Sequence, residues 1–254
     1  MSRPQQLSFW LKRSAPILGA FGLLALAGPA FAQDVSISFG EDGTVTERAV
    51  QIVLLLTILS LAPSILVMVT SFTRIVVVLS LLRTAIGLQT APPNTVMVSL
   101  ALFLTGFVMA PTFEAAYEAG VRPLVEESIE LPEAFERASE PFHVFMRRHV
   151  REQDLQLFLD LAGGERPETP EAIELRVLVP AFMISELRRA FEIGFLLFVP
   201  FIIIDLVVAS VLMSMGMMML PPVVISLPFK LIFFVLVDGW HMVAGSLVQS
   251  YTGG

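Results

Sequence analysis

The stretch DLVVASVLMSMGMMMLPP, residues 205–222, joins two strongly apolar segments through a turn that carries no charged side chain. Five of the chain's twelve methionines fall within its last ten residues, beside Gly216 and ahead of Pro221 and Pro222. Glycine permits a tight backbone bend, and proline cannot continue a helix. We therefore predict a helical hairpin in which Gly216, Pro221 and Pro222 break the helix and flexible thioethers lie at the tip.

Composition places the chain among integral membrane proteins. Of its 254 residues, 55% are hydrophobic and 15% are charged, and the mean hydropathy is +0.78. Soluble domains average about 45–50% apolar and about 25% charged residues. The net charge of −7 is local, because residues 112–176 hold 15 acidic side chains against 7 arginines. The chain has no basic stripe for nucleic acid, and its lack of cysteine excludes disulfides, thiol catalysis and Cys-ligated zinc.

The N-terminus is typical of a cleavable signal peptide at residues 1–32. Basic side chains precede an apolar core at residues 17–27, and Ala-Phe-Ala at residues 30–32 supplies a small-x-small cleavage site. An uncleaved membrane anchor is the alternative, but the apolar core is shorter than the roughly 20 residues that a span needs. A short polar segment, residues 33–48, follows.

Residues 49–111 predict a first pair of hydrophobic helices. The run at residues 49–72 is long enough to cross a bilayer, with a kink at Pro63, and the run at residues 95–110 stops at Pro111. Arginines between the two runs place their connection in the cytoplasm by the positive-inside bias.

The rest of the chain predicts further helices and an all-α fold. Residues 112–176 alternate apolar and charged side chains at helical spacing, which predicts a charged helical periplasmic segment ending at a glycine pair. Residues 177–254 predict an amphipathic helix, a second hydrophobic hairpin with the methionine turn, and the C-terminus. The apolar runs together suggest four membrane spans.

The segment PAFMISELRRAFEIGF, residues 180–195, separates into two faces on a helix. One face is apolar and carries Met183, Ile184, Leu187, Ala190, Phe191 and Gly194. The other carries Ser185, Arg188, Arg189 and Glu192, with Arg188 and Glu192 spaced for an i,i+4 ion pair. Such a helix either lies on the membrane surface or packs against other subunits. We favour subunit packing, because the adjoining apolar run contains Asp205 among isoleucines.

Lys230 and Asp238 stand two helical turns apart, so we expect them to share a helix face without reaching each other. Each would then need a partner from elsewhere in a complex. Alternatively, Lys230 extends to a lipid headgroup and Asp238 caps a helix that begins at Gly239. The polar residues that we expect at subunit interfaces are Glu186, Arg188, Arg189, Glu192, Asp205, Lys230 and Asp238.

Catalytic signals are sparse. His143, His149 and His241 lack HExxH spacing, and the chain has no Gly-rich phosphate loop and no GxSxG elbow. An acid–base couple of Asp205 and Asp238 is the remaining catalytic alternative, and packing explains both residues more simply. We therefore expect no enzyme activity, no cofactor and no metal.

Several of these motifs together resemble the FliP family of flagellar biosynthetic proteins, subunits of the type III secretion export gate. The resemblance rests on PAFMISELRRAFEIGF, DLVVASVLMSMGMMMLPP, SLPFKLIFFVLVDGW, PFHVFMRRHVREQDLQLF and TSFTRIVVVLSLLRTAIGLQTAPPN, and it covers residues 50–251. Virulence-type injectisomes carry a homologous subunit. The methionine turn and the signal peptide are more similar to the flagellar branch.

The resemblance implies a place in a large assembly of the bacterial inner membrane at the flagellar basal body. Five copies would form a helical ring with FliQ- and FliR-type subunits, near the large export-gate subunits and membrane lipid. Unfolded flagellar proteins would pass through the ring, which lies largely above the bilayer plane.

The resemblance also implies that the methionine turn constricts this pore. The constriction residues would be Met215, Met217, Met218 and Met219. Methionine is unbranched and polarizable, so a ring of methionines can exclude water and still adapt to a passing chain. The alternatives are methionines that fill an apolar core or face lipid, and a stand-alone channel or transporter, which would show inverted repeats that are not visible here.

Overall fold

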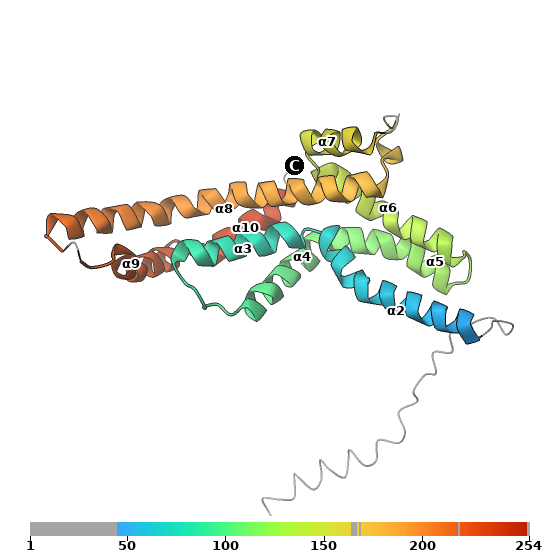
Figure 1. The fold of residues 1–254 in the computed structure, drawn as a ribbon, viewed down its shortest axis with the longest axis horizontal. Helices are drawn as coiled ribbons and strands as arrows, with labels where there is room; N and C mark the ends of the chain where they lie inside the picture. Colours follow the sequence, from blue (N-terminus) through green and yellow to red (C-terminus); the bar gives the residue numbers. More distant parts are fainter. Residues whose placement is uncertain (1–44, 164–166, 168, 218, 253–254) are drawn as a thin grey trace, which may run out of the picture. The chain divides into compact units, whose positions relative to one another are not determined.

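Every regular element in the described part of the chain is a helix, as the sequence predicts (Figure 1). The computed structural model describes residues 45–163, 167, 169–217 and 219–252. The predicted signal peptide and most of the polar segment that follows it lie outside the described residues. The α-helices are α2 (Val45–Met68), α3 (Phe72–Ile86), α4 (Asn94–Ala116), α5 (Arg122–Val125), α6 (Leu131–His149), α7 (Glu152–Ala162), α8 (Leu175–Ser214), α9 (Pro222–Leu236) and α10 (Gly239–Thr252).

Two shorter helical segments connect these helices. A π-helical segment, η1 (Tyr117–Val121), continues α4 directly into α5, and a 3-10 turn, η2 (Pro170–Ala172), precedes α8. The chain divides into two compact units, residues 1–56 and 57–254. The described part of the first unit is the first half of α2. The remaining elements belong to the second unit, which contains the candidate site.

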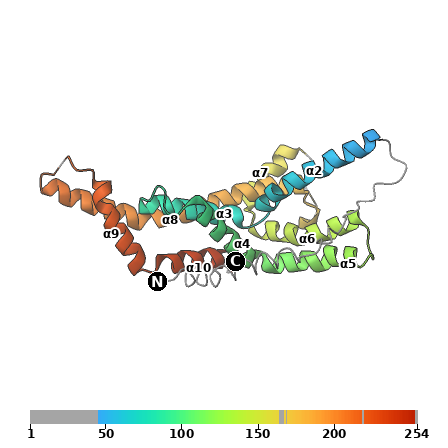
Figure 2. The ribbon, with the colours of Figure 1, turned by 90° about the horizontal axis from the view of Figure 1, so that it is seen from below.

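The core of the second unit lies where α3 packs along the first half of α8 (Figures 1 and 2). Gly194 of α8 leaves room for the side chain of Leu81 on α3, since an added Cβ would lie 2.3 Å from Cδ1 of Leu81. Buried side chains recur on α3 every three or four residues, which is the spacing of one helix face. The buried core includes Ile75, Val78, Leu79, Leu82 and Ile86 of α3 and Leu178, Phe182 and Ala190 of α8.

The predicted second hairpin is present. Helices α8 and α9 pack against each other on either side of the methionine turn, and α10 follows after a bend of 63°. The charged segment is also helical as predicted: α6 packs on α4 and α8, and α7 packs on α8. Helix α7 ends at the predicted glycine, because Gly163 adopts a left-handed conformation with φ of 65°.

Two helix boundaries differ from the predicted ones. Helix α4 runs through Pro111 to Ala116, although we expected it to stop there, and it therefore crosses the predicted boundary at residues 111 and 112. Helix α8 is one helix of 40 residues containing Pro180 and Pro200, and it joins the amphipathic and apolar parts that we expected separately. A proline removes one helical hydrogen bond, and packing of the surrounding turns outweighs that loss.

Two or three of the four predicted membrane spans have counterparts among the described helices. Among the described helices, Asn94–Val125 and Leu175–Ser214 are each long and apolar enough to cross a bilayer. Helices α9 and α10 form a bent pair, which provides a third span if the two helices together cross the membrane once. The remaining predicted span, residues 49–72, stays a prediction. The long apolar helices are compatible with a membrane protein.

Candidate functional site: the methionine turn

The methionine turn is held by the hydrogen-bond pattern that commonly ends helices at a glycine. Gly216 has φ of 76°, its N–H donates to the carbonyl of Met213 (3.1 Å), and the N–H of Met217 donates to the carbonyl of Leu212 (3.0 Å). These are the two bonds of a Schellman motif, which needs a left-handed residue at the position of Gly216. The structure therefore places Gly216 at the bend that follows α8.

The proline pair acts at the second helix of the hairpin and not at the first. Pro221 directly precedes α9, and Pro222 is its first residue. We expected both prolines to end the preceding helix, which in fact ends at Ser214. Proline suits a helix start because its missing N–H would have no partner there and its fixed φ is already helical.

The methionines of the turn are exposed. The exposed fraction is 58% for Met213, 61% for Met215, 39% for Met217 and 97% for Met219, whereas Met109 and Met146 elsewhere in the chain are fully buried. Met218 lies outside the described residues. The four described thioethers therefore do not fill the core of their own chain, and they remain available to lipid, water or another chain.

We expect Gly216→Ala to weaken the turn. An L-residue in the left-handed region costs about 1–2 kcal/mol, and Gly216 has open space around it, so the cost is one of backbone conformation alone. Gly245→Ala is the matched control, because Gly245 lies within α10 with nothing within 4 Å and no positive φ. Thermal unfolding in detergent should show a lower midpoint for the first variant only. Equal midpoints would contradict the role of Gly216.

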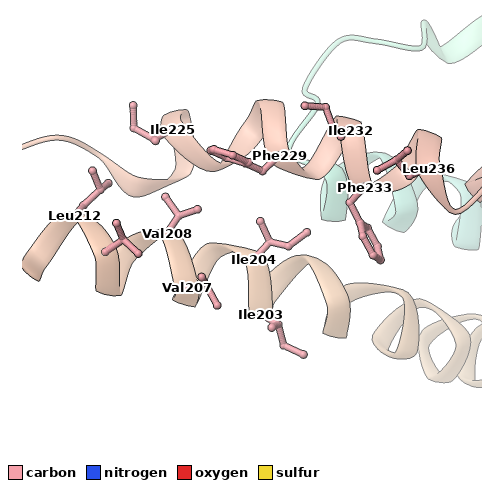
Figure 3. A pocket seen from close by; sticks show the side chains of 11 residues that line it. Ile203, Ile204, Val207, Val208, Leu212, Ile225, Phe229, Ile232, Phe233 and Leu236 are labelled. Carbon is pink, nitrogen blue, oxygen red and sulfur yellow. The ribbon is translucent and has the colours of Figure 1, made fainter.

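An apolar groove lies between the two helices that lead into the turn (Figure 3). It encloses about 580 Å³ and is lined only by aliphatic and phenylalanine side chains of α8 and α9. In Figure 3, Ile204 and Val208 point from α8 toward α9, and Phe233 points back toward α8. The groove between α8 and α9 is thus uncharged, as is the turn at the tip of the hairpin.

A charged pair joins the same two helices. The buried Lys230 of α9 donates to Oδ2 of Asp205 on α8 (2.7 Å) and to the carbonyl of Ala85 on α3 (3.3 Å), and the hydroxyl of Ser226 donates to Oδ1 of Asp205. We expected Asp205 and Lys230 to need partners from other subunits, and that expectation was wrong. The two residues are 25 positions apart, and they meet because α8 and α9 pack against each other in the hairpin. Spacing along a single helix cannot predict such a pair.

Asp238 is not part of this arrangement. Helix α9 ends at Leu236, so Asp238 does not share a helix face with Lys230 as we expected. It is exposed at the joint between α9 and α10, with φ of 50°, and its carbonyl accepts from the N–H of Met242 (3.1 Å). The carboxylate of Asp205 is instead engaged by Lys230 and Ser226, so no acid–base couple with Asp238 is assembled by the described contacts.

A second charged group, the Arg74–Glu186–Tyr251 cluster, ties α3, α8 and α10 together. Nε of Arg74 donates to Oε2 of Glu186 (3.0 Å), its Nη2 donates to Oε1, and the hydroxyl of Tyr251 donates to the same carboxylate. The guanidinium also donates to the Ser250 hydroxyl (3.1 Å) and lies 3.9 Å from the centre of the Tyr251 ring. All three members of the cluster are buried.

This cluster corrects two predictions about α8. Glu186, which we expected at a subunit interface, is buried within its own chain. The predicted polar and apolar faces were also assigned wrongly, because Ser185 is buried while Ile184 and Phe191 are exposed. Buried polar groups are tolerated when they are hydrogen-bonded, and here the partners come from helices that are distant in sequence. The predicted i,i+4 pair of Arg188 and Glu192 is present and exposed (3.1 Å).

The charged segment is attached to α8 by hydrogen bonds that no sequence pattern indicated. The Ser185 hydroxyl donates to Oδ2 of Asp154 on α7 (2.7 Å) and accepts from the N–H of Arg151 (3.0 Å). His149 lies within 2.8 Å of the carbonyl of Phe145, and burial lowers its pKa below the ordinary value. His149 is therefore a neutral packing residue at pH 7.

A linker contact precedes α8. Arg147 of α6 pairs with Glu171 (2.5 Å), and this hydrogen bond lowers the pKa of the Glu171 carboxyl. His143 also meets the linker, with Nε2 2.7 Å from the carbonyl of Ile173. Within the described residues, no group of three His, Cys, Asp or Glu side chains is arranged to hold a metal ion. The polar residues of this region therefore hold neighbouring elements together through hydrogen bonds and an ion pair.

Comparison with known proteins assigns the chain to one family. The FliP family profile matches residues 55–247. A Flagellar biosynthetic protein FliP from Caulobacter vibrioides is 62% identical over 247 residues, covering 96% of this chain and 93% of that relative. Relatives of the same name from Bacillus subtilis and Rhizobium meliloti are 53% and 51% identical, covering 85% and 90% of this chain and 98% and 96% of their own lengths. The chain therefore belongs to the FliP family.

Proposed function

We propose that this chain is a structural, pore-forming subunit of the flagellar type III protein export gate. Its relatives are named flagellar biosynthetic proteins. This name supports assigning the chain to the flagellar export apparatus. In this proposal about five copies assemble with FliQ- and FliR-type subunits, and unfolded flagellar proteins pass between them. The chain performs no catalytic step and needs no cofactor.

The observation that carries the proposal is the exposed methionine turn. Four thioethers are exposed at the tip of a helical hairpin, and the hydrogen bonds around Gly216 fix the backbone that carries them. A channel for unfolded chains must block ions and yet accept many different sequences. Flexible apolar thioethers suit both demands, because they can exclude water from a narrow opening and rearrange around a passing side chain.

Exposed residues of α8 support the assembly part of the proposal. Ile184 and Phe191 are exposed on the same helix as the Arg188–Glu192 ion pair. A charged and apolar surface of this kind is costly against lipid tails, so contact with a sister chain explains it better. Arg188, Arg189, Glu192 and Asp238 are the members of the predicted interface set that remain assigned to contacts between subunits.

The charged helices suggest the orientation of the chain. The exposed ion pairs of Arg122 with Glu118 and Glu126 lie on η1 and α5, and surface pairs of this kind are typical of segments outside the lipid core. We place the segment 112–176 in the periplasm, and we place the protein in the bacterial inner membrane at the flagellar basal body. The exported N-terminus and the cytoplasmic arginines of the first connection support this orientation.

Disulfide cross-linking tests whether the turns of different copies meet. The chain has no cysteine of its own, so Met219→Cys introduces one thiol at the tip of the hairpin. When wild-type partner subunits are present in native membranes, mild oxidation should link at least two chains through this position. Glu126→Cys, at the exposed position that directly follows α5, is the control and should remain unlinked. A Met219→Cys protein that stays monomeric under conditions that oxidise its thiol would overturn the proposal.

A further inference from the structure

The ion pairs of the C-terminal helices account for all but two of the charged side chains there. Residues 174–254 contain nine Asp, Glu, Lys and Arg side chains. Arg189 of α8 and Asp238 at the joint of α9 and α10 form no ion pair with the described part of the chain, and they have opposite charges. The other seven are paired, namely Glu174, Arg176, Glu186, Arg188, Glu192, Asp205 and Lys230.

Both remaining charges need a partner. Arg189 is partly buried on a helix that is long and apolar enough to cross a bilayer, and Asp238 is exposed between two apolar helices. A charge is costly against lipid tails and also when protein covers it without a partner. We propose that Arg189 of one copy forms an ion pair with Asp238 of the next copy. This inference rests on the proposed function, since it names a contact that joins the assembled copies.

The two residues lie at different heights along α8. Val237 and Gly239, which flank Asp238, line one cavity together with Leu197 of α8. Arg189 precedes Leu197 by eight residues, which is about 12 Å along the helix axis. An ion pair needs its nitrogen and oxygen atoms within about 4 Å of each other. A second copy that is displaced along α8 can bring the two charges together, whereas a single chain keeps them apart.

A contact of this kind repeats from copy to copy. Each chain offers Arg189 to one neighbour and Asp238 to the other, so the interface is heterologous, and heterologous interfaces generate rings or helical assemblies. The side chains around both charges fit a covered contact. Phe191 and Phe195 are 58% and 68% exposed on α8, and Trp240 beside the joint is 41% exposed. Apolar side chains that exclude water from an ion pair strengthen it.

Charge exchange tests the pairing. Asp238→Arg places like charges at the contact, so the amount of assembled protein in mild detergent should fall at least about tenfold. Adding Arg189→Asp restores opposite charges and should recover most of the assembly. Adding Arg176→Asp gives the same net charge near the start of α8, where the residue has only an exposed pair with Glu174, and should recover little. Equal recovery by the two second changes would overturn the pairing.

Cross-linking between two differently tagged copies tests the contact directly. One copy carries Arg189→Cys and the other carries Asp238→Cys. A short bis-maleimide is used, because an arginine–aspartate pair holds its Cα atoms farther apart than a disulfide allows. A product with both tags is expected in native membranes. Each variant expressed alone should give no linked dimer, and a dimer of either one would contradict a heterologous contact.

The Met219→Cys cross-link separates this inference from the proposed function. If that cross-link forms but no product carries both tags, the contact is overturned and the proposed function stands. The same result is expected if lipid phosphate is the partner of Arg189. If Met219→Cys also stays unlinked, the proposed function fails and the contact fails with it.

Discussion

Replacing Glu186 with leucine is expected to destabilise the folded chain by about 3–5 kcal/mol, because removing one member of a buried ion pair leaves the other charge uncompensated. The guanidinium of Arg74 is 1% exposed and would lose both hydrogen bonds to the carboxylate. The hydroxyl of Tyr251 would lose its acceptor at the same time. Thermal unfolding and protease resistance in detergent measure the effect. A loss of this size would leave little folded protein for assembly.

The same helix provides the control for this prediction. Glu192 also pairs with an arginine, Arg188, but both side chains are more than half exposed. Glu192→Leu should therefore change stability by no more than about 1 kcal/mol. The double variant Arg74→Leu, Glu186→Leu should recover much of the loss, since apolar side chains can replace a buried pair. If Glu186→Leu unfolded at the same temperature as Glu192→Leu, the Arg74–Glu186–Tyr251 cluster would not stabilise the fold as we describe.

Local sequence signals predicted much of this fold. The long apolar helices follow from apolar runs of membrane-spanning length, and the helices of the charged segment follow from helical spacing of apolar side chains. The turns at Gly163 and Gly216 follow from the left-handed conformations that glycine adopts readily. The exposed pair of Arg188 and Glu192 follows from i,i+4 spacing alone. Each of these features depends on residues within one or two helical turns of one another, which is the range that a sequence pattern describes.

The failures with the largest consequences concern contacts between distant residues. Arg74 and Glu186 are 112 positions apart, and the hairpin that joins Asp205 to Lys230 spans 25. Without these partners, we assigned Ser185 to an outward polar face of α8 and Glu186 to a subunit interface. The sequence alone could not show that their hydrogen bonds are satisfied within the chain. The same tertiary packing carries α4 through Pro111, where the local rule predicts an end.

Replacing Met217, Met218 and Met219 with alanine is the change from which we expect the largest functional effect. Alanine keeps the turn uncharged but shortens the side chains that would fill the opening, so a ring of several copies would lose its water-excluding contacts. The variants should fold normally, because Met217 and Met219 are exposed and make no contribution to the buried core of their own chain. The resting gate should then conduct ions.

A matched variant separates this effect from a general loss of methionine. Met242 is 60% exposed on α10, away from the turn, and Met242→Ala should leave the membrane as tight as wild type. Substituting leucine at the three turn positions restores apolar bulk and should restore most of the seal. A leak that appeared equally in the Met242 variant would point to a disturbed assembly and not to an open constriction.

The most direct test of the account is the ion leak of cells that assemble the triple alanine variant, measured alongside wild type and Met242→Ala at equal amounts of assembled protein. Our account predicts that the triple variant raises the leak at least about tenfold and slows growth at high salt, because a hydrated opening conducts where a dewetted one does not. Membranes that stay as ion-tight as wild type, with normal export of flagellar proteins, would contradict it.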